Sequence, residues 1–276
     1  MNDMSLKAKI KHIAKEKNIS AQAVLQNYLM SRFLYRLSLS EYKDKFVLKG
    51  GMLIASIIGI DHRVTMDLDT TLKGLPLDES SIKTAFEAIC GVNTDDGIEY
   101  KYDSITPIRD DDEYGGYRVS FHADYGKIKA PMSMDVSTGD VITPGARQNT
   151  FKDLLNENVL FKLWSYTIET VLAEKIETIL SRGIDNTRPR DFYDVYMLSG
   201  FDCNADVFKE AFRATATHRG SFEKISDFNS IVEKIGASTE MNQRWNEYSR
   251  RMPYANGIKF EDTLVVMNEM LAHSAM

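Results

Sequence analysis

The chain has 276 residues, of which 43% are hydrophobic and 27% are charged, a composition typical of a globular protein with a sizeable core. Its 34 basic and 40 acidic residues give a net charge of −6, which argues against broad coating of a nucleic acid but is compatible with a local basic patch that holds an RNA end. The two cysteines lie far apart and the longest apolar run, Met52 to Ile60, is too short to cross a bilayer, so we expect a cytoplasmic protein with reduced thiols and no membrane association.

The first segment, residues 5–38, predicts two helices separated by Asn18 to Ser20. The hydroxyl of Ser20 can cap the second helix, in which apolar residues recur at helical spacing. The first helix is basic because it carries Lys7, Lys9, Lys11, Lys15 and Lys17. These lysines could contact nucleic acid, although a solvated helix face is the commoner role of such a run.

The stretch from Lys49 to Thr71 predicts a turn, a short helix and a strand. The strand would place its apolar and polar side chains on opposite faces, with Val64, Met66 and Leu68 on one face and Thr65, Asp67 and Asp69 on the other. Two neighbouring carboxylates on one strand face are costly unless a cation lies between them, and Mg²⁺ or Mn²⁺ prefers such oxygen ligands. Asp67 and Asp69 are therefore candidate metal ligands.

Gly50 and Gly51 precede the predicted short helix, which begins near Met52. Glycine lets the backbone approach a ligand closely, and a helix N-terminus attracts an anion such as phosphate. A phosphate between this helix and a metal held by Asp67 and Asp69 would form a nucleotide site. The alternative interpretation is a glycine turn followed by an edge strand whose acids are solvated.

A helix is predicted at residues 78–90, with Asp78 as its cap, and a strand at residues 98–108. The next strand alternates apolar and polar residues, with Tyr117, Val119 and Phe121 on one face and Arg118, Ser120 and His122 on the other. We interpret His122 as an ordinary histidine of the sheet face, because no second metal ligand stands at a suitable spacing.

A later strand, Met132 to Asp140, carries a third acid, because Asp135 lies between two apolar residues and points away from their face. If this strand lies beside the one with Asp67 and Asp69, three carboxylates converge. Three carboxylates can hold two divalent ions for in-line phosphoryl or nucleotidyl transfer. Asp140 is the competing third acid, but the strand register favours Asp135.

The helix predicted at residues 167–182 has one lysine, Lys175, in the middle of its apolar stripe. The stripe consists of Ile168, Val171, Leu172, Ile176 and Ile179. Either the stem of Lys175 passes the helix edge to reach water, or its ammonium is paired in an interior cleft. Triphosphate oxygens would be a suitable partner in such a cleft.

Pro189 starts a further helix, in which Asp191 and Asp194 lie on the same face as apolar residues. Three arginines make this the most basic neighbourhood near the candidate site: Arg182, Arg188 and Arg190. Phosphate contact and ion pairing with the nearby acids are both open roles for them.

Beyond Cys203 the sequence predicts a helical bundle, with amphipathic helices near residues 204–217, 222–235, 239–251 and 260–272. The aromatic and arginine residues between Gln243 and Tyr254 could stack on bases, although such positions more often belong to a core.

Two blocks of the sequence resemble a known family. The first runs from Phe46 to Thr70 and contains Lys-Gly-Gly, a short apolar helix, Arg63 and Asp-Leu-Asp, and the second runs from Thr167 to Leu198. The first block is similar to the opening motif of the nucleotidyltransferase superfamily. Both blocks in this order resemble the AbiEii/AbiGii-like abortive-infection nucleotidyltransferase toxins, and the resemblance extends to about residue 200.

This resemblance implies a role for each residue of the site. The catalytic residues would be Asp67, Asp69, Asp135, Lys175 and Asp191, of which the first three would bind Mg²⁺ or Mn²⁺. The nucleoside triphosphate would be bound by Lys49, Gly50, Gly51, Arg63, Thr65, Lys175, Arg190 and Asp194. Lys175 would hold the triphosphate, and Asp191, in preference to Asp194, would assist the acceptor hydroxyl.

The resemblance further implies a metal-dependent nucleotidyltransferase toxin of a bacterial toxin–antitoxin or phage-defence system. It would transfer a nucleoside monophosphate from a nucleoside triphosphate to an acceptor, for which RNA, in particular the 3′ end of tRNA, is the first choice. The antitoxin is expected to be a separate protein that need not form a stable complex. Two alternatives are a phosphotransferase acting on a protein or small molecule and a non-catalytic nucleotide-binding regulator.

The expected fold is α/β, with a nucleotidyltransferase-like mixed β-sheet and flanking helices followed by a mainly helical C-terminal domain. Residues 1–160 would form the catalytic domain with the N-terminal helices. Residues 161–276 would form a helical bundle that contributes Lys175 and Asp191 to the site.

Overall fold

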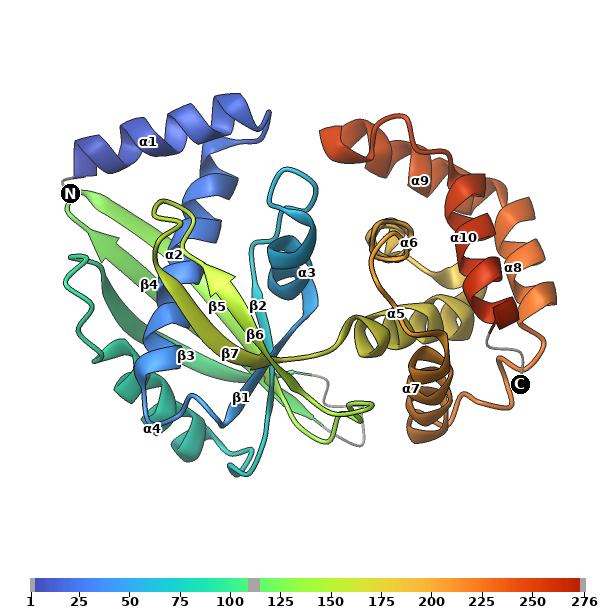
Figure 1. Ribbon diagram of the computed structural model, residues 1–276, viewed down its shortest axis with the longest axis horizontal. Helices are drawn as coiled ribbons and strands as arrows, with labels where there is room; N and C mark the ends of the chain where they lie inside the picture. Colours follow the sequence, from blue (N-terminus) through green and yellow to red (C-terminus); the bar gives the residue numbers. More distant parts are fainter. Residues whose placement is uncertain (1–2, 109–114, 274–276) are drawn as a thin grey trace. The chain divides into compact units, whose positions relative to one another are not determined.

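The computed structural model describes residues 3–108 and 115–273. The chain forms two compact units, residues 1–140 with 147–165, and residues 141–146 with 166–276. The first unit contains the sheet and helices α1 to α4, and the second contains helices α5 to α10 (Figure 1). Within the described residues, no helix combines the length and the apolar character that crossing a bilayer requires.

The first unit is built on a mixed sheet of seven strands within the described residues, in the order β3-β4-β5-β2-β1-β7-β6. The strands are β1 (Phe46–Lys49), β2 (Leu68–Leu72), β3 (Glu99–Ile108), β4 (Gly116–Tyr125), β5 (Ile128–Ser137), β6 (Arg147–Lys152) and β7 (Leu160–Ser165). The helices of this unit are α1 (Asp3–Glu16), α2 (Ala21–Leu39), α3 (Gly50–Ile58) and α4 (Glu79–Cys90). Strands β2 and β5 pair in parallel, as do β1 and β7, and the expected mixed sheet with flanking helices is confirmed.

Strands β4 and β5 form a hairpin in which apolar and polar residues alternate in register. Val119 pairs with Met134 and Phe121 with Met132 on the buried face, whereas Ser120 pairs with Ser133 on the polar face. A two-residue turn with Gly126 at a φ of +57° joins the strands. Since strand side chains have a period of two, this register puts the buried apolar residues of the hairpin on one side.

Helices α2 and α4 cover the apolar face of the hairpin. Phe33 of α2 and Phe86 of α4 lie with their ring centroids 5.1 Å apart, and Phe121 of β4 lies 5.0 Å from the first ring and 4.8 Å from the second. All three rings are fully buried. The opposite face of the hairpin is polar, and His122 lies on it, where its Nδ1 is 2.8 Å from the carboxylate of Asp103.

The predicted helices of this unit are present, and their caps follow the sequence. The Ser20 hydroxyl accepts a hydrogen bond from the Ala23 N–H at 3.1 Å, and the Asp78 carboxylate accepts one from the Ser81 N–H at 2.8 Å. The predicted strand from residue 64 was too long, because β2 begins only at Leu68 and Met66 is 43% exposed. Strands β1, β6 and β7 were not predicted.

The second unit consists of helices within its described residues: α5 (Ile168–Arg182), α6 (Pro189–Leu198), α7 (Ala205–His218), α8 (Phe228–Ala237), α9 (Thr239–Arg251) and α10 (Phe260–His273), with the short 3₁₀ turns η1 (Gly183–Asp185) and η2 (Pro253–Ala255). The side chain of Thr167 caps α5 by accepting from the Thr170 N–H, and Pro189 occupies the first position of α6. Trp245 of α9 is buried against Phe260 of α10, so this aromatic residue belongs to the core.

A buried network of charges joins α2 to two loops of the first unit. Arg32 donates to Asp96 at 2.7 Å and to Asp153 at 3.0 Å, and Arg36 donates to Asp96 at 2.7 Å. Burial alone would raise the pKa of Asp96, but the hydrogen bonds and charges of the two arginines outweigh it and lower that pKa from 3.8 to about 2. The charged form of Asp96 therefore stabilises the fold.

Replacing Asp96 by Asn should destabilise the first unit by roughly 3–5 kcal/mol at pH 7, because two buried guanidinium groups lose their shared carboxylate. The pKa of Asp96 is lower in the folded than in the unfolded chain, so its contribution is complete above about pH 4 and is lost as the pH falls toward 2. Urea unfolding between pH 7 and pH 3 should therefore show a shallower loss of stability in the variant. Asp124→Asn, which breaks a pair on the surface with Lys101, is the control and should leave the unfolding midpoint nearly unchanged. An equally stable Asp96→Asn variant would contradict this account.

Candidate active site

Four charged residues lie side by side across four strands of the first unit and form what we call the charged row. Lys49 of β1 pairs in register with Asp69 of β2, Asp69 with Asp135 of β5, and Asp135 with Arg118 of β4. Side chains at paired positions point to the same face of a sheet, and here that face is the polar one. The two acids at the centre of the row are thus flanked by a cation at each end.

Asp69 is held against the start of α3. Gly50 has a φ of +65°, and a Cβ at this position would lie only 2.6 Å from Cγ of Asp69, so a glycine is required both by the backbone and by the packing. The N–H of Gly51 points at Oδ2 of Asp69 at 3.4 Å. Burial raises the pKa of Asp69 and the neighbouring charge of Asp135 raises it further, whereas Lys49 and the Gly51 N–H act in the opposite direction.

Asp67 lies just before β2 and is exposed, unlike the strand position that the sequence predicts for it. Its carboxylate accepts a hydrogen bond from the hydroxyl of Ser133 on β5 at 2.6 Å. Its backbone carbonyl accepts one from the Thr65 hydroxyl at 3.2 Å. The segment before the strand is therefore shaped by side-chain contacts and not by pairing in the sheet.

Arg63 and Thr65, both predicted to bind nucleotide, support the same segment. Arg63 is buried and donates to the carbonyl of Val64. Thr65 lies against Gly51, where a Cβ would come within 2.6 Å of the Thr65 hydroxyl oxygen. The two glycines thus leave room for the side chains of Asp69 and Thr65.

Lys49, another predicted nucleotide ligand, is engaged by Asp140. Its ammonium donates to the Asp140 carboxylate at 2.7 Å, and the hydroxyl of Ser137 donates to the same oxygen at 2.7 Å. Burial would raise the pKa of Asp140, but the charge and hydrogen bond of Lys49, with the hydroxyl hydrogen bonds, lower it from 3.8 to about 2. Asp140 follows β5 and is not part of the charged row, so Asp135 is the acid that faces Asp69.

The carboxylates of Asp67, Asp69 and Asp135 and the hydroxyl of Ser133 offer oxygen ligands, which suit a hard divalent cation. The pKa of Asp69 is raised first by burial and then by the negative charge of Asp135. Asp135 is bound by both arms of the Arg118 guanidinium, at 2.7 and 2.8 Å. With the side chains so arranged, no three His, Cys, Asp or Glu residues of the described part of the chain are grouped closely enough to hold a metal. The residues fit Mg²⁺ or Mn²⁺ in kind, and Asp135 is shared with Arg118.

The helical unit brings together Lys175, Asp191 and Asp194. The Lys175 ammonium is 2.7 Å from a carboxylate oxygen of each acid, and Arg188 is 2.9 Å from the second oxygen of Asp191. Both acids are almost completely buried, and the Lys175 side chain is 13% exposed. The lysine is therefore paired in the interior and does not extend past the helix edge to water.

Two side-chain contacts of the site were not predicted from the sequence, that of Arg118 with Asp135 and that of Ser133 with Asp67. Arg118 was predicted only as an ordinary polar residue of a strand, and Ser133 was not singled out. The contact of Arg118 with Asp135 could have been predicted from the turn at Gly126 and Lys127. A two-residue hairpin loop fixes the register of the two strands and places Arg118 opposite Asp135. The contact of Ser133 with Asp67 depends on the parallel pairing of β2 with β5, which no local pattern specifies.

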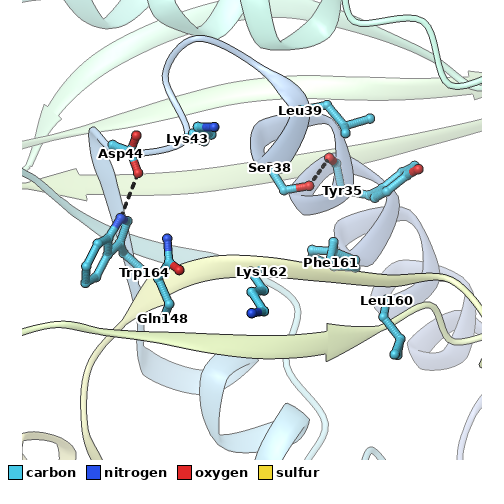
Figure 2. Close-up of a pocket in the computed structure, with 10 residues that line it drawn as sticks. All are labelled: Tyr35, Ser38, Leu39, Lys43, Asp44, Gln148, Leu160, Phe161, Lys162 and Trp164. Carbon is cyan, nitrogen blue, oxygen red and sulfur yellow. Dashed lines mark hydrogen bonds between the residues drawn. The ribbon is translucent and has the colours of Figure 1, made fainter.

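A separate cavity of about 330 Å³ in the first unit contains none of the predicted site residues (Figure 2). It lies between the end of α2 and strands β6 and β7, and Trp164 on its wall donates to Asp44 at 2.8 Å. Lys73 lies over the Trp164 ring at 5.4 Å, so the indole is held by its own unit. This cavity is not part of the candidate site.

Comparison with solved structures shows similar folds. MenT4, a nucleotidyltransferase toxin from Mycobacterium tuberculosis H37Rv, is 15% identical, with a TM-score of 0.58 and 98% of each chain covered. JHP933 from Helicobacter pylori is 18% identical, with 93% of each chain covered and a TM-score of 0.48. The comparison with curated proteins gave no match. The first of these likenesses supports a nucleotidyltransferase-like fold.

The family model described as "Nucleotidyl transferase AbiEii toxin, Type IV TA system" matches residues 32–265, which include both the charged row and the Lys175 cluster. This match spans most of the chain and confirms the family that the two sequence blocks resemble. The protein therefore belongs to the AbiEii family of nucleotidyltransferase toxins of type IV toxin–antitoxin systems.

Proposed function

We propose that the protein transfers a nucleoside monophosphate from a nucleoside triphosphate to the 3′ end of an RNA, with tRNA as the first candidate, and that it requires Mg²⁺ or Mn²⁺. The observation that carries this proposal is the adjacency of Asp69 and Asp135 on one sheet face, with Asp67 beside them and the start of α3 against Asp69. Such transfer onto RNA would make the protein toxic, and a separate antitoxin protein would counteract it without the need for a stable complex. Defence against phage is the proposed setting.

In this proposal Asp67, Asp69 and Asp135 would hold the metal, which would polarise the phosphates and neutralise their charge. Ser133 would orient Asp67, and the Gly51 N–H would orient Asp69. Lys49, with Arg63 and Thr65, would keep the start of α3 in shape beside the nucleotide.

The helical unit would supply Lys175 for the triphosphate and Asp191 for the acceptor. The acceptor hydroxyl oxygen would form a bond to the α-phosphorus, the bond between that phosphorus and the bridging oxygen would break, and pyrophosphate would leave. Asp191 would take the proton of the hydroxyl, with Asp194 keeping Lys175 in place. Both acids contact Lys175, and Asp191 is also paired with Arg188; this contact is the basis for giving the two acids different roles.

The first test is transfer of label from each α-labelled nucleoside triphosphate to total cellular RNA in the presence of Mg²⁺. The wild-type protein should label an RNA band, and Asp67→Asn or Asp69→Asn should reduce the rate on the order of 100-fold or more, because charge stabilisation in the transition state is lost. Asp103→Asn, which removes an acid that pairs with His122, is the matched control and should retain activity. Transfer of γ-label to a protein or small molecule would replace this proposal with a phosphotransferase.

The second test measures binding of Mn²⁺ or Mg²⁺ by the shift in unfolding temperature. The metal should stabilise the wild-type protein, and Asp69→Asn should remove this shift. Arg118→Gln should tighten metal binding a few-fold, since the metal no longer competes with a guanidinium for Asp135; the effect is modest because Arg118 is half exposed. Lys101→Gln is the control. Weaker metal binding by Arg118→Gln would contradict the competition.

The third test concerns Lys175. Lys175→Gln should abolish transfer and also destabilise the protein, since two buried carboxylates lose their cation. Combining it with Asp194→Asn removes one unpaired charge and should restore much of the stability. If the double variant is stable and inactive while Asp194→Asn alone keeps activity, Lys175 acts in the reaction. If activity returns together with stability, Lys175 has only a structural role.

A further inference from the structure

The helical unit contains a cavity of about 440 Å³ whose wall is formed by the start of α6 and one side of α9. Four arginines of the described residues line it: Arg188, Arg190, Arg244 and Arg251. Tyr248 also lines it, and Glu247 is the one acid among its lining residues. We call this site the arginine cavity.

Two of the four arginines are neutralised by the protein. Arg188 pairs with Asp191 at 2.9 Å. Arg244 pairs with Glu240 and donates to the carbonyl of Asn186 at 2.7 Å, which ties α9 to the segment before α6. These two side chains shape the cavity and hold its two walls together.

The other two, Arg190 and Arg251, have no ion pair or hydrogen bond within the part of the chain that the structure describes, and both are exposed. They come from different helices and meet at one cavity. Because both line the same cavity, a ligand that carries several negative charges can contact the two guanidinium groups together.

We propose that the arginine cavity binds the phosphodiester backbone of RNA. The planar guanidinium groups of Arg190 and Arg251 can each bind phosphate oxygens in a bidentate manner, and a polyanion with several phosphates can engage both. Tyr248 lines the cavity with its ring packed near Trp245 and Tyr193, and its hydroxyl lies 3.5 Å from that of Tyr254, so the aromatic residue supports the wall beside the arginines. This inference rests on the proposed function, in which RNA is the acceptor, and it assigns Arg190 to RNA and not to the nucleoside triphosphate.

The cavity also accounts for how a chain with a net charge of −6 can bind a polyanion. Binding depends on a local concentration of arginine and not on the overall charge. Phosphate contacts of this type carry little sequence information, so the cavity would position the RNA, and base readout would lie elsewhere.

The test is binding of fluorescein-labelled bulk tRNA, followed by anisotropy without nucleotide or divalent metal. Arg190→Gln with Arg251→Gln should weaken binding about 10-fold or more at physiological salt. It should also lower the slope of log K against log salt concentration by between about 1 and 2, since two phosphate contacts are lost. The matched control is Arg213→Gln with Arg250→Gln, which removes two exposed arginines that do not line the cavity. This control should bind RNA as the wild type does.

Equal RNA binding by the cavity variant and the control variant would overturn the inference. Competition by poly-glutamate as effective as that by unlabelled tRNA would also overturn it, because it would indicate an acidic protein as the partner. A cavity variant that loses binding of labelled ATP but keeps RNA binding would overturn it as well. The proposed reaction is tested separately. RNA labelling by a protein whose RNA affinity does not depend on Arg190 and Arg251 would refute only the inference. Arginine-dependent RNA binding without label transfer would refute only the proposed acceptor.

Discussion

The repulsion between Asp69 and Asp135 is the constraint on which the candidate site depends. Parallel pairing of β2 with β5 puts these two carboxylates next to each other, and burial of Asp69 increases the cost of their charge. The protein answers with the charged row, in which Lys49 and Arg118 flank the acids, and with the N–H of Gly51. The pKa of Asp69 nevertheless stays raised, first by burial and then by the charge of Asp135. A fold selected for stability alone would have little reason to keep such a pair, whereas a site for a cation and phosphates needs it.

The helical unit also pairs buried acids with cations, but with the cation at the centre. There a single ammonium, Lys175, lies between two buried carboxylates, and Arg188 adds a second positive charge. Each proposed catalytic acid that is buried therefore has a protein cation in contact or in register. Substrate binding would exchange these internal partners for phosphate oxygens and metal, so most of the charge compensation is already present before the ligand arrives.

The sequence predicts much of this site because period and spacing specify local geometry. Alternation in β5 placed Asp135 away from the apolar face, and the helical period of α5 identified Lys175 as a buried charge that needs a partner. Long-range pairing was beyond such reasoning. The contact of β2 with β5 spans more than sixty residues of chain, and β1, β6 and β7 are short strands without a clear pattern. Asp67 was misplaced because Thr65 and Arg63 shape the segment before β2 through side-chain contacts that override its alternation.

Gly50 has a further consequence for how related chains are recognised. Its positive φ and its close approach to Asp69 make residues 50 and 69 one geometric unit, although nineteen peptide bonds separate them. A search pattern that accepts any small residue at the first position of the Gly-Gly pair would collect chains whose aspartate cannot occupy this place. A search for such toxins should therefore require the first glycine of the motif and the second aspartate of Asp-Leu-Asp together, because neither residue alone separates them from other nucleotidyltransferase-like folds.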